Sequence, residues 1–109
     1  MKTINGQQLK EQLDSGANVT VLEALSEQYF RAGHIPGARN LPMDELDKTT
    51  PSLVPDHSTP IVVYCASETC ANSHTAAKRL TELGYRDVAV YVGGKADWQA
   101  LGYPLGKAA

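Results

Sequence analysis

The most constraining feature of this 109-residue sequence is a set of short, β-branched apolar runs separated by segments with helical patterning. The clearest runs are residues 19–22, 61–64 and 88–91, and residues 3–4 and 38–41 are weaker candidates. Short runs that are almost wholly apolar are typical of strands buried on both faces of a parallel sheet. Strands that alternate with helices pair through right-handed crossovers, so the sequence predicts a three-layer α/β domain.

Helix signals occur in four segments, three of which have both a polar capping residue and a closing glycine. These pairs are Asn5 with Gly16, Ser26 with Gly33, and Ser73 with Gly84. The segment after Ser73 is the longest, and its apolar residues form one stripe. A fourth, short helix carries Trp98, which we expect to be an anchor of the core.

The length and composition of the chain indicate one soluble globular domain, which we assign to residues 1–109. The ten Lys and Arg residues are outnumbered by twelve Asp and Glu residues and are scattered singly, so we expect no binding of nucleic acid. The N-terminus lacks the apolar run of a signal peptide, and no stretch is long enough to cross a bilayer. We therefore expect a cytoplasmic protein with no membrane partner.

The two cysteines are too few for the disulfide framework of a secreted domain, so we expect free thiols. They also do not form a metal site with the distant histidines, because zinc needs about four ligands at workable spacing. The Gly93–Gly94 pair resembles a phosphate-binding loop only weakly, since the full fingerprint is absent. We interpret this pair as allowing the backbone to turn close to the loop that follows Cys65.

Cys65 stands where chemistry is expected in such a fold, because ligands bind beyond the carboxyl ends of the strands. It follows the run 61–64 and faces the start of the longest helix, where free N–H groups and partial positive charge favour a thiolate. The same position also suits a small apolar residue that ends a core strand. The loop that would surround its sulfur comprises Ala66, Ser67, Glu68, Thr69, Cys70, Ala71, Asn72 and Ser73.

Two further side chains leave alternatives open. Cys70 is either an incidental, partly exposed thiol or a resolving or second sulfur-carrying thiol. Because it lies in the same loop as Cys65, we expect mild oxidation to join the two in a disulfide, if the loop curls. His34 lies in a Gly- and Pro-rich turn, and we interpret it as a hydrogen-bonding support rather than a proton-transfer group.

Three motifs occur in a fixed order along nearly the whole chain. The first is the stretch 33–38 with Asn40 and Pro42, the second is 61–65 with the helix beginning near Ser73, and the third comprises Gly93, Gly94, Trp98, Gly102 and Pro104. Together these motifs resemble the rhodanese homology domain. Each motif alone is weak, and their order and spacing carry the resemblance.

The resemblance implies a five-stranded parallel sheet flanked by helices, with a persulfide on Cys65 at the end of the central strand. It also implies transfer of sulfane sulfur from a small-molecule donor such as thiosulfate, or from a protein persulfide, to a thiol or cyanide acceptor. No metal and no organic cofactor is expected.

The sequence departs from the family pattern at residues that would bind an anionic donor. Asn72 stands where many members have an arginine, and Glu23 and Leu25 match the usual Asp and Arg at the end of the second strand. No side-chain cation therefore lies between Cys65 and Ser73. Glu68 adds a negative charge, which predicts poor use of a dianionic donor.

Two other functions compete with sulfur transfer. A catalytically weak rhodanese-like module could bind a partner or sense thiol oxidation, and Cys70 favours the sensing version. A phosphatase or arsenate reductase would also use a cysteine loop, but it normally needs an arginine to neutralise the transferred group. No arginine lies between Cys65 and Ser73, so we disfavour this class.

Overall fold

The computed structural model describes residues 2–107, and the strands in that range form one parallel sheet. The strands are β1 (Lys2–Ile4), β2 (Thr20–Glu23), β3 (Arg39–Asn40), β4 (Ile61–Tyr64) and β5 (Val88–Tyr91), in the order β1-β5-β4-β2-β3. The helices are α1 (Gly6–Asp14), α2 (Glu27–Ala32), α3 (Leu46–Leu53), α4 (Asn72–Glu82) and α5 (Gly94–Ala100), and a 3₁₀ turn, η1 (Met43–Glu45), precedes α3. The predicted α/β fold with five parallel strands is confirmed.

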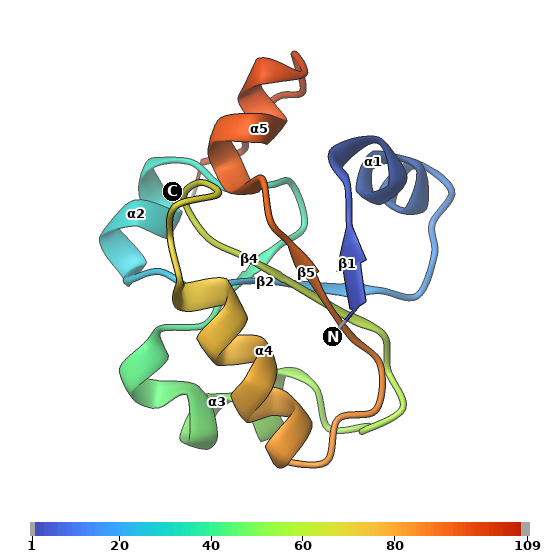
Figure 1. Cartoon of the computed structure of the whole chain (residues 1–109), viewed down its shortest axis with the longest axis vertical. Coiled ribbons are helices and arrows are strands. Elements are labelled where there is room, and N and C mark those ends of the chain that lie inside the picture. Colours follow the sequence, from blue (N-terminus) through green and yellow to red (C-terminus); the bar gives the residue numbers. More distant parts are fainter. Residues whose placement is uncertain (1, 108–109) are drawn as a thin grey trace.

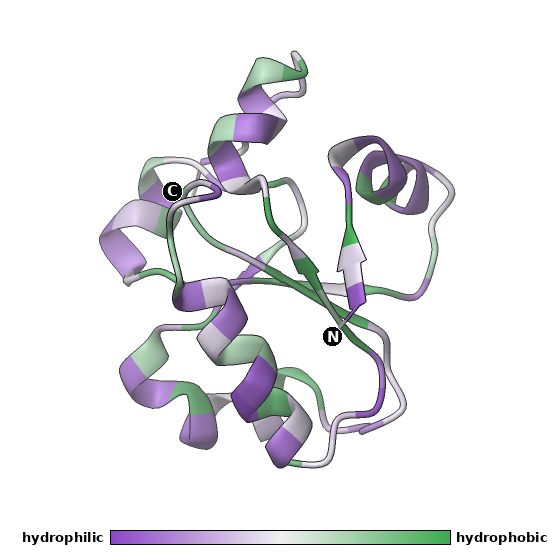
Figure 2. Ribbon diagram, viewed as in Figure 1, coloured by the Kyte–Doolittle hydropathy of each residue, from purple (hydrophilic) through white to green (hydrophobic). Residues whose placement is uncertain are grey.

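Both faces of the sheet are covered by helices, with α3 and α4 below the strands of Figure 1 and α1 and α5 above them. Successive side chains of β4 point to opposite faces. Ile61 and Val63 join the core beneath α4, whereas Val62 and Tyr64 join the core that contains Trp98. Figure 2 shows the result, since β4 and β5 are hydrophobic along their length while the helices are mixed.

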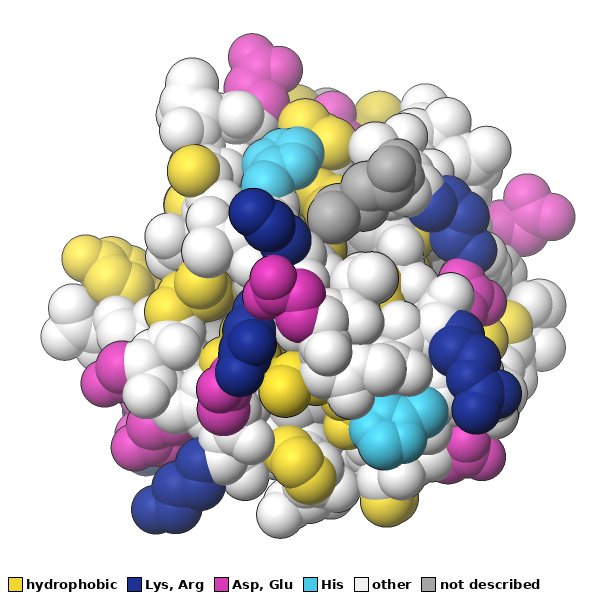
Figure 3. Space-filling model, turned by 60° about the horizontal axis from the view of Figure 1, so that its bottom comes forward, with side chains coloured by type: hydrophobic (Ala, Val, Ile, Leu, Met, Phe, Trp, Pro, Cys, Tyr) yellow, Lys and Arg dark blue, Asp and Glu magenta, His cyan; other side chains and the backbone are white. Residues whose placement is uncertain are grey.

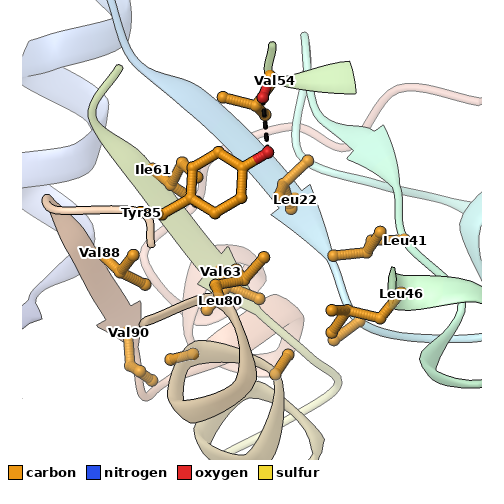
Figure 4. Close-up of a cluster of buried hydrophobic side chains, with 13 residues drawn as sticks. Leu22, Leu41, Leu46, Val54, Ile61, Val63, Leu80, Tyr85, Val88 and Val90 are labelled. Carbon is orange, nitrogen blue, oxygen red and sulfur yellow. Dashed lines mark hydrogen bonds between the residues drawn. The ribbon is translucent and has the colours of Figure 1, made fainter. Parts of the chain in front are cut away.

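The core beneath α4 is formed by aliphatic side chains from the sheet and from the helices α3 and α4, together with one tyrosine (Figure 4). Leu80 of α4 packs in the same cluster as Val63 and Leu22 of the sheet, and all three side chains are fully buried. The Tyr85 hydroxyl donates a hydrogen bond of 2.6 Å to the carbonyl of Val54, so the one polar atom that this ring brings inside is satisfied. The contact also ties the chain after α4 to the end of α3.

The helix ends follow the sequence signals in part. Asn5 caps α1 in a capping box with Gln8, and Gly84 closes α4 with a φ of 98°. The prediction that Ser73 caps the long helix is wrong, because α4 already begins at Asn72. The Ser73 hydroxyl lies inside the first turn and contacts the thiol of Cys65 instead of a backbone N–H.

The 3₁₀ turn and α3 were not apparent from the sequence. The segment contains two threonines and Pro51, and these residue types are poor helix formers. Burial compensates for this weak helix propensity, since Leu46 and Val54 belong to the core beneath α4. The Thr50 hydroxyl is also satisfied within the helix, by a 2.7 Å bond to the carbonyl of Leu46.

The surface seen when the lower side of Figure 1 is turned forward carries basic and acidic side chains next to each other (Figure 3). One such pair joins two helices, since Arg79 of α4 lies 2.6 Å from Asp47 of α3. No helix in residues 2–107 is long and apolar enough to cross a membrane.

We expect Tyr85→Phe to lower the free energy of unfolding by about 1 kcal/mol, because the variant leaves the buried carbonyl of Val54 without its donor. Urea unfolding of both proteins measures this difference. Tyr29→Phe is the matched control, since the Tyr29 side chain is 54% exposed and its loss of a hydroxyl should change stability by less than about 0.5 kcal/mol. Equal effects of the two changes would contradict the role of the buried bond.

Candidate active site

Cys65 is the first residue after the central strand, and its side chain is only 1% exposed. Its thiol lies 3.3 Å from the carbonyl oxygen of Cys70 and 3.5 Å from the hydroxyl of Ser73. One contact comes from the loop and the other from the first turn of α4. The sulfur is therefore enclosed between the end of β4, the loop and the start of the helix.

The loop of residues 66–71 turns back over Cys65. The N–H of Cys70 donates to the carbonyl of Ser67 at 3.1 Å, and the Ser67 and Thr69 hydroxyls lie 3.0 Å apart. At the far end the Asn72 side-chain amide donates to the carbonyl of Ala24 at 3.0 Å, which fastens the loop to the chain after β2. The exposed members of the loop are Ala66, Glu68, Thr69 and Ala71.

The start of α5 forms the other wall of the loop. The backbone N–H of Lys95 donates to the carbonyl of Cys65 at 3.0 Å, and that of Ala96 donates to the carbonyl of Ala66 at 2.9 Å. This approach requires glycine at position 94, where φ is 64° and a Cβ atom would lie 2.4 Å from the Cys65 carbonyl oxygen. Gly94 is thus the residue that lets α5 reach the loop.

The two thiols have opposite tendencies to ionise. Burial raises the pKa of Cys65, and its interaction with the Cys70 side chain raises it further, while hydrogen bonds from Ser73 oppose both effects. Burial also acts against ionisation of Cys70, but hydrogen bonds from Cys65 and from the backbone N–H groups of Asn72 and Ala66 outweigh it and lower the pKa of Cys70. Of the two thiols, Cys70 is therefore the one whose ionisation the loop favours.

This arrangement corrects the expectation that the helix N-terminus makes Cys65 the thiolate. The expectation neglected desolvation, which is large for a side chain that is 1% exposed. It also neglected that the loop N–H groups could be used by a second sulfur. Only the three-dimensional path of the loop determines which of the two sulfurs receives them.

A buried ion pair lies behind the loop. The Glu23 carboxylate at the end of β2 is completely buried, and it accepts a 2.7 Å hydrogen bond from the Tyr64 hydroxyl. Its other oxygen lies 3.2 Å from the ammonium group of Lys95. Burial raises the pKa of Glu23, and the contacts with Tyr64 and Lys95 partly offset this rise.

The Lys95 ammonium also donates to two carbonyl groups around α2, at 2.8 Å to Tyr29 and 2.6 Å to Gly33. It therefore neutralises Glu23 and holds α2 in place, and it does not replace the missing cation of the loop. In the sequence, Glu23 was apparent only as a departure from a family pattern, and the roles of Lys95 and Tyr64 were not apparent. An acidic residue ending an apolar strand is the signal that could have prompted a search for a buried cation.

The other residues that were predicted to support the site are far from Cys65 in the sequence. The Nδ1 atom of His34 lies 2.9 Å from the carbonyl of Phe30, and the two rings stack with centroids 3.9 Å apart. Trp98 is 1% exposed and its indole N–H donates to the carbonyl of Pro104 at 2.9 Å. A Cβ atom at Gly93 would lie 2.4 Å from the Cβ of Asp97, so this glycine allows the first turn of α5 to close.

Two hollows of different character lie at opposite ends of the sheet. One of about 390 Å³ adjoins the Cys65 loop and is lined by Glu68, Tyr91, Gly93 and Asp97 among others. The other, of about 710 Å³, lies at the amino ends of the strands, between residues such as Val19 and Ile61, and is remote from Cys65. Of the two, only the smaller hollow is lined by a residue of the Cys65 loop, which is Glu68. Within residues 2–107, no group of three or more side chains of the metal-binding types is placed to hold an ion.

Comparison with known families and relatives agrees with this geometry. The family described as Rhodanese-like domain matches residues 5–101, so the chain belongs to that family. An HTH-type transcriptional regulator of Mycobacterium tuberculosis, Rv0324, is 32% identical over 91 residues, which are 84% of this chain and 39% of the regulator. YrkF, a candidate sulfur carrier protein of Bacillus subtilis, is 27% identical over 89 residues, which are 82% of this chain and 46% of YrkF. The chain thus spans less than half the length of these relatives.

Solved structures show the same fold. The rhodanese-like domain of an Anabaena protein, determined by solution NMR, matches 99% of this chain and 80% of its own with a TM-score of 0.87 and 28% identity. A thiosulfate sulfurtransferase from Pseudomonas aeruginosa is similar to all of this chain, with a TM-score of 0.89 and 24% identity. The match covers 21% of the Pseudomonas aeruginosa protein. At 24% identity, the similarity to the Pseudomonas aeruginosa protein shows the fold alone.

We expect Lys95→Met to lower the free energy of unfolding by about 3 kcal/mol at neutral pH, because it leaves the buried Glu23 carboxylate without a cation. The pKa of Glu23 would then rise further above its value in the unfolded chain. The folded state would bind a proton that the unfolded state releases, so the stability of the variant should fall as pH rises through this interval. Urea unfolding in mild acid and at neutral pH measures the effect.

Two variants control this experiment. Lys10→Met removes the surface partner of Asp14 and should cost less than about 1 kcal/mol. Combining Lys95→Met with Glu23→Gln removes the unpaired charge and should recover part of the lost stability. If Lys95→Met were as stable as the wild type at neutral pH, the ammonium group would not be needed by the buried carboxylate.

Proposed function

We propose that this chain is a sulfurtransferase that carries sulfane sulfur as a persulfide on Cys65. The donor is thiosulfate or another persulfide, and the acceptor is a thiol or cyanide. The observation that supports this most directly is the enclosure of the Cys65 thiol at the carboxyl end of the central strand, between the 66–71 loop and Ser73. Family membership supports the same reaction class, since many rhodanese-like proteins are sulfurtransferases.

Burial of Cys65 favours a carrier role because it keeps a bound sulfur away from water and from stray thiols. Loading requires Cys65 to attack the sulfane sulfur of the donor, which breaks the donor's bond to that sulfur and releases the rest of the donor as a thiolate or sulfite. Ser73 offers the bound sulfur a hydroxyl from the first turn of α4.

The relatives are in keeping with this proposal. YrkF is named for sulfur carriage, and the Pseudomonas aeruginosa protein is named a thiosulfate sulfurtransferase. The present loop lacks a side-chain cation between Cys65 and Ser73 and presents Glu68 on its exposed side. For this reason we propose a persulfide, rather than the dianion thiosulfate, as the better donor.

Two single-thiol variants test the carrier. After exposure to a low-molecular-weight persulfide and removal of the donor, Cys70→Ser should retain one added sulfur atom by intact mass. Cys65→Ser should retain none, because the thiol that remains is in the partly exposed loop and its persulfide would be open to exchange. Equal retention by the two variants would remove Cys65 from the mechanism.

Glu68 tests the choice of donor. Replacing it by Gln and then by Arg should raise kcat/KM for thiosulfate on the order of fivefold per step, because a unit charge a few ångströms away is worth about 1 kcal/mol in water. Turnover with a neutral or singly charged persulfide should change less. The matched control is Glu82→Gln at the opposite end of α4. Flat thiosulfate kinetics across the Glu68 series would show that this carboxylate does not face the donor.

A second candidate is a binding or thiol-sensing module with little transferase activity, and the interacting pair of Cys65 and Cys70 favours it. This module would form the internal disulfide with peroxide but would retain no sulfur in the Cys70→Ser variant. The mass measurement described above therefore separates the two functions.

A further inference from the structure

The loop contains an acceptor for the sulfur that Cys65 carries. We propose that Cys70 is a resolving residue, which attacks the persulfide on Cys65, expels hydrosulfide and leaves a Cys65–Cys70 disulfide. This inference rests on the proposed carrier role of Cys65 and names the acceptor of that same site. It makes the domain a persulfide reductase that is reset by an external dithiol.

The first support is the position of the two residues. The Cys65 sulfur lies 3.3 Å from the carbonyl oxygen of Cys70, which places it within about 6 Å of the Cys70 Cα atom by standard bond lengths. The loop is closed by the 3.1 Å bond from the Cys70 N–H to Ser67, so it curls rather than extends. A curled loop is the condition under which two cysteines this close in sequence can meet the geometry of a disulfide.

The second support is the division of roles between the two sulfurs. Cys65 is 1% exposed, whereas Cys70 is partly exposed. The loop N–H groups of Ala66 and Asn72 favour negative charge on Cys70, so this outer sulfur is suited to attack a sulfur atom held on Cys65. An external acceptor would have to reach a sulfur enclosed by the loop, while Cys70 is already beside it, at a high effective concentration.

The step balances in atoms and electrons. A lone pair of the Cys70 thiolate forms a bond to the Cys65 sulfur, and the bond between that sulfur and the terminal sulfur breaks. The terminal sulfur leaves with the bonding electrons and its proton as HS⁻, so it is reduced while the Cys70 sulfur is oxidised, and the Cys65 sulfur keeps the oxidation state that it had in the persulfide. A dithiol then exchanges with the disulfide, is itself oxidised, and returns both cysteines to thiols.

The experiment compares the full chain with Cys70→Ser. Each reduced protein is treated without oxygen and without added reductant with one equivalent of glutathione persulfide and is then freed of small molecules. The wild type should release an equimolar amount of hydrosulfide, lose both titratable thiols and become lighter by two hydrogen atoms. Cys70→Ser should release little hydrosulfide and become heavier by one sulfur atom, and Cys70→Ala should behave in the same way.

Two contrary results have different meanings. If the wild type holds a persulfide as long as Cys70→Ser does and releases no more hydrosulfide, Cys70 is not a resolving residue, while the carrier role of Cys65 stands. If neither protein gains sulfur or releases hydrosulfide, the carrier role itself fails and the resolving step fails with it.

Discussion

Burial of β4 on both faces is the constraint on which the rest of the molecule depends. Val62 and Tyr64 face one core and Ile61 and Val63 face the other, so this strand can occupy only the middle of the sheet. Its carboxyl end must then open between the two helical layers. Cys65 lies at that point because it is the next residue along the chain, and the α4 and α5 ends that surround it are brought there by the same packing.

The two sides of the site are held by different kinds of contact. Behind Cys65, the ion pair of Glu23 with Lys95 joins the end of β2 to α5 and α2, and the Tyr64 hydroxyl joins the same carboxylate to β4. A buried charge pair adds little net stability, yet removal of one partner is costly, so the network fixes the relative position of these elements. In front, the loop is held mainly by backbone bonds, and several of its side chains are exposed. Such a division suits the proposed entry and exit of a sulfur atom.

The two thiols give the loop a chemistry that one thiol would not. Enclosure suits Cys65 to the proposed carrier role but also raises its pKa, whereas hydrogen bonds from the loop N–H groups lower the pKa of Cys70. The two side chains interact and share the hydrogen bonds that the loop and the start of α4 offer. This sharing connects the proposed carriage of sulfur with its proposed release inside the same loop.

The sequence by itself determined the fold class, four of the five main helices and the location of Cys65, because alternating β-branched runs and helix signals are local patterns that persist in the folded chain. It did not reveal α3, whose threonines and proline oppose a helix until Leu46 and Val54 are buried. It predicted that Ser73 caps a helix and that a thiolate is favoured at Cys65. In the structure Ser73 lies in the first turn of α4 and contacts Cys65, and burial raises the pKa of Cys65. Only the tertiary structure decided that Lys95 neutralises Glu23 and that Cys70 receives hydrogen bonds from the loop N–H groups. The first contact depends on the distance between residues far apart in the sequence, and the second depends on the path of the loop. Local sequence patterns encode neither.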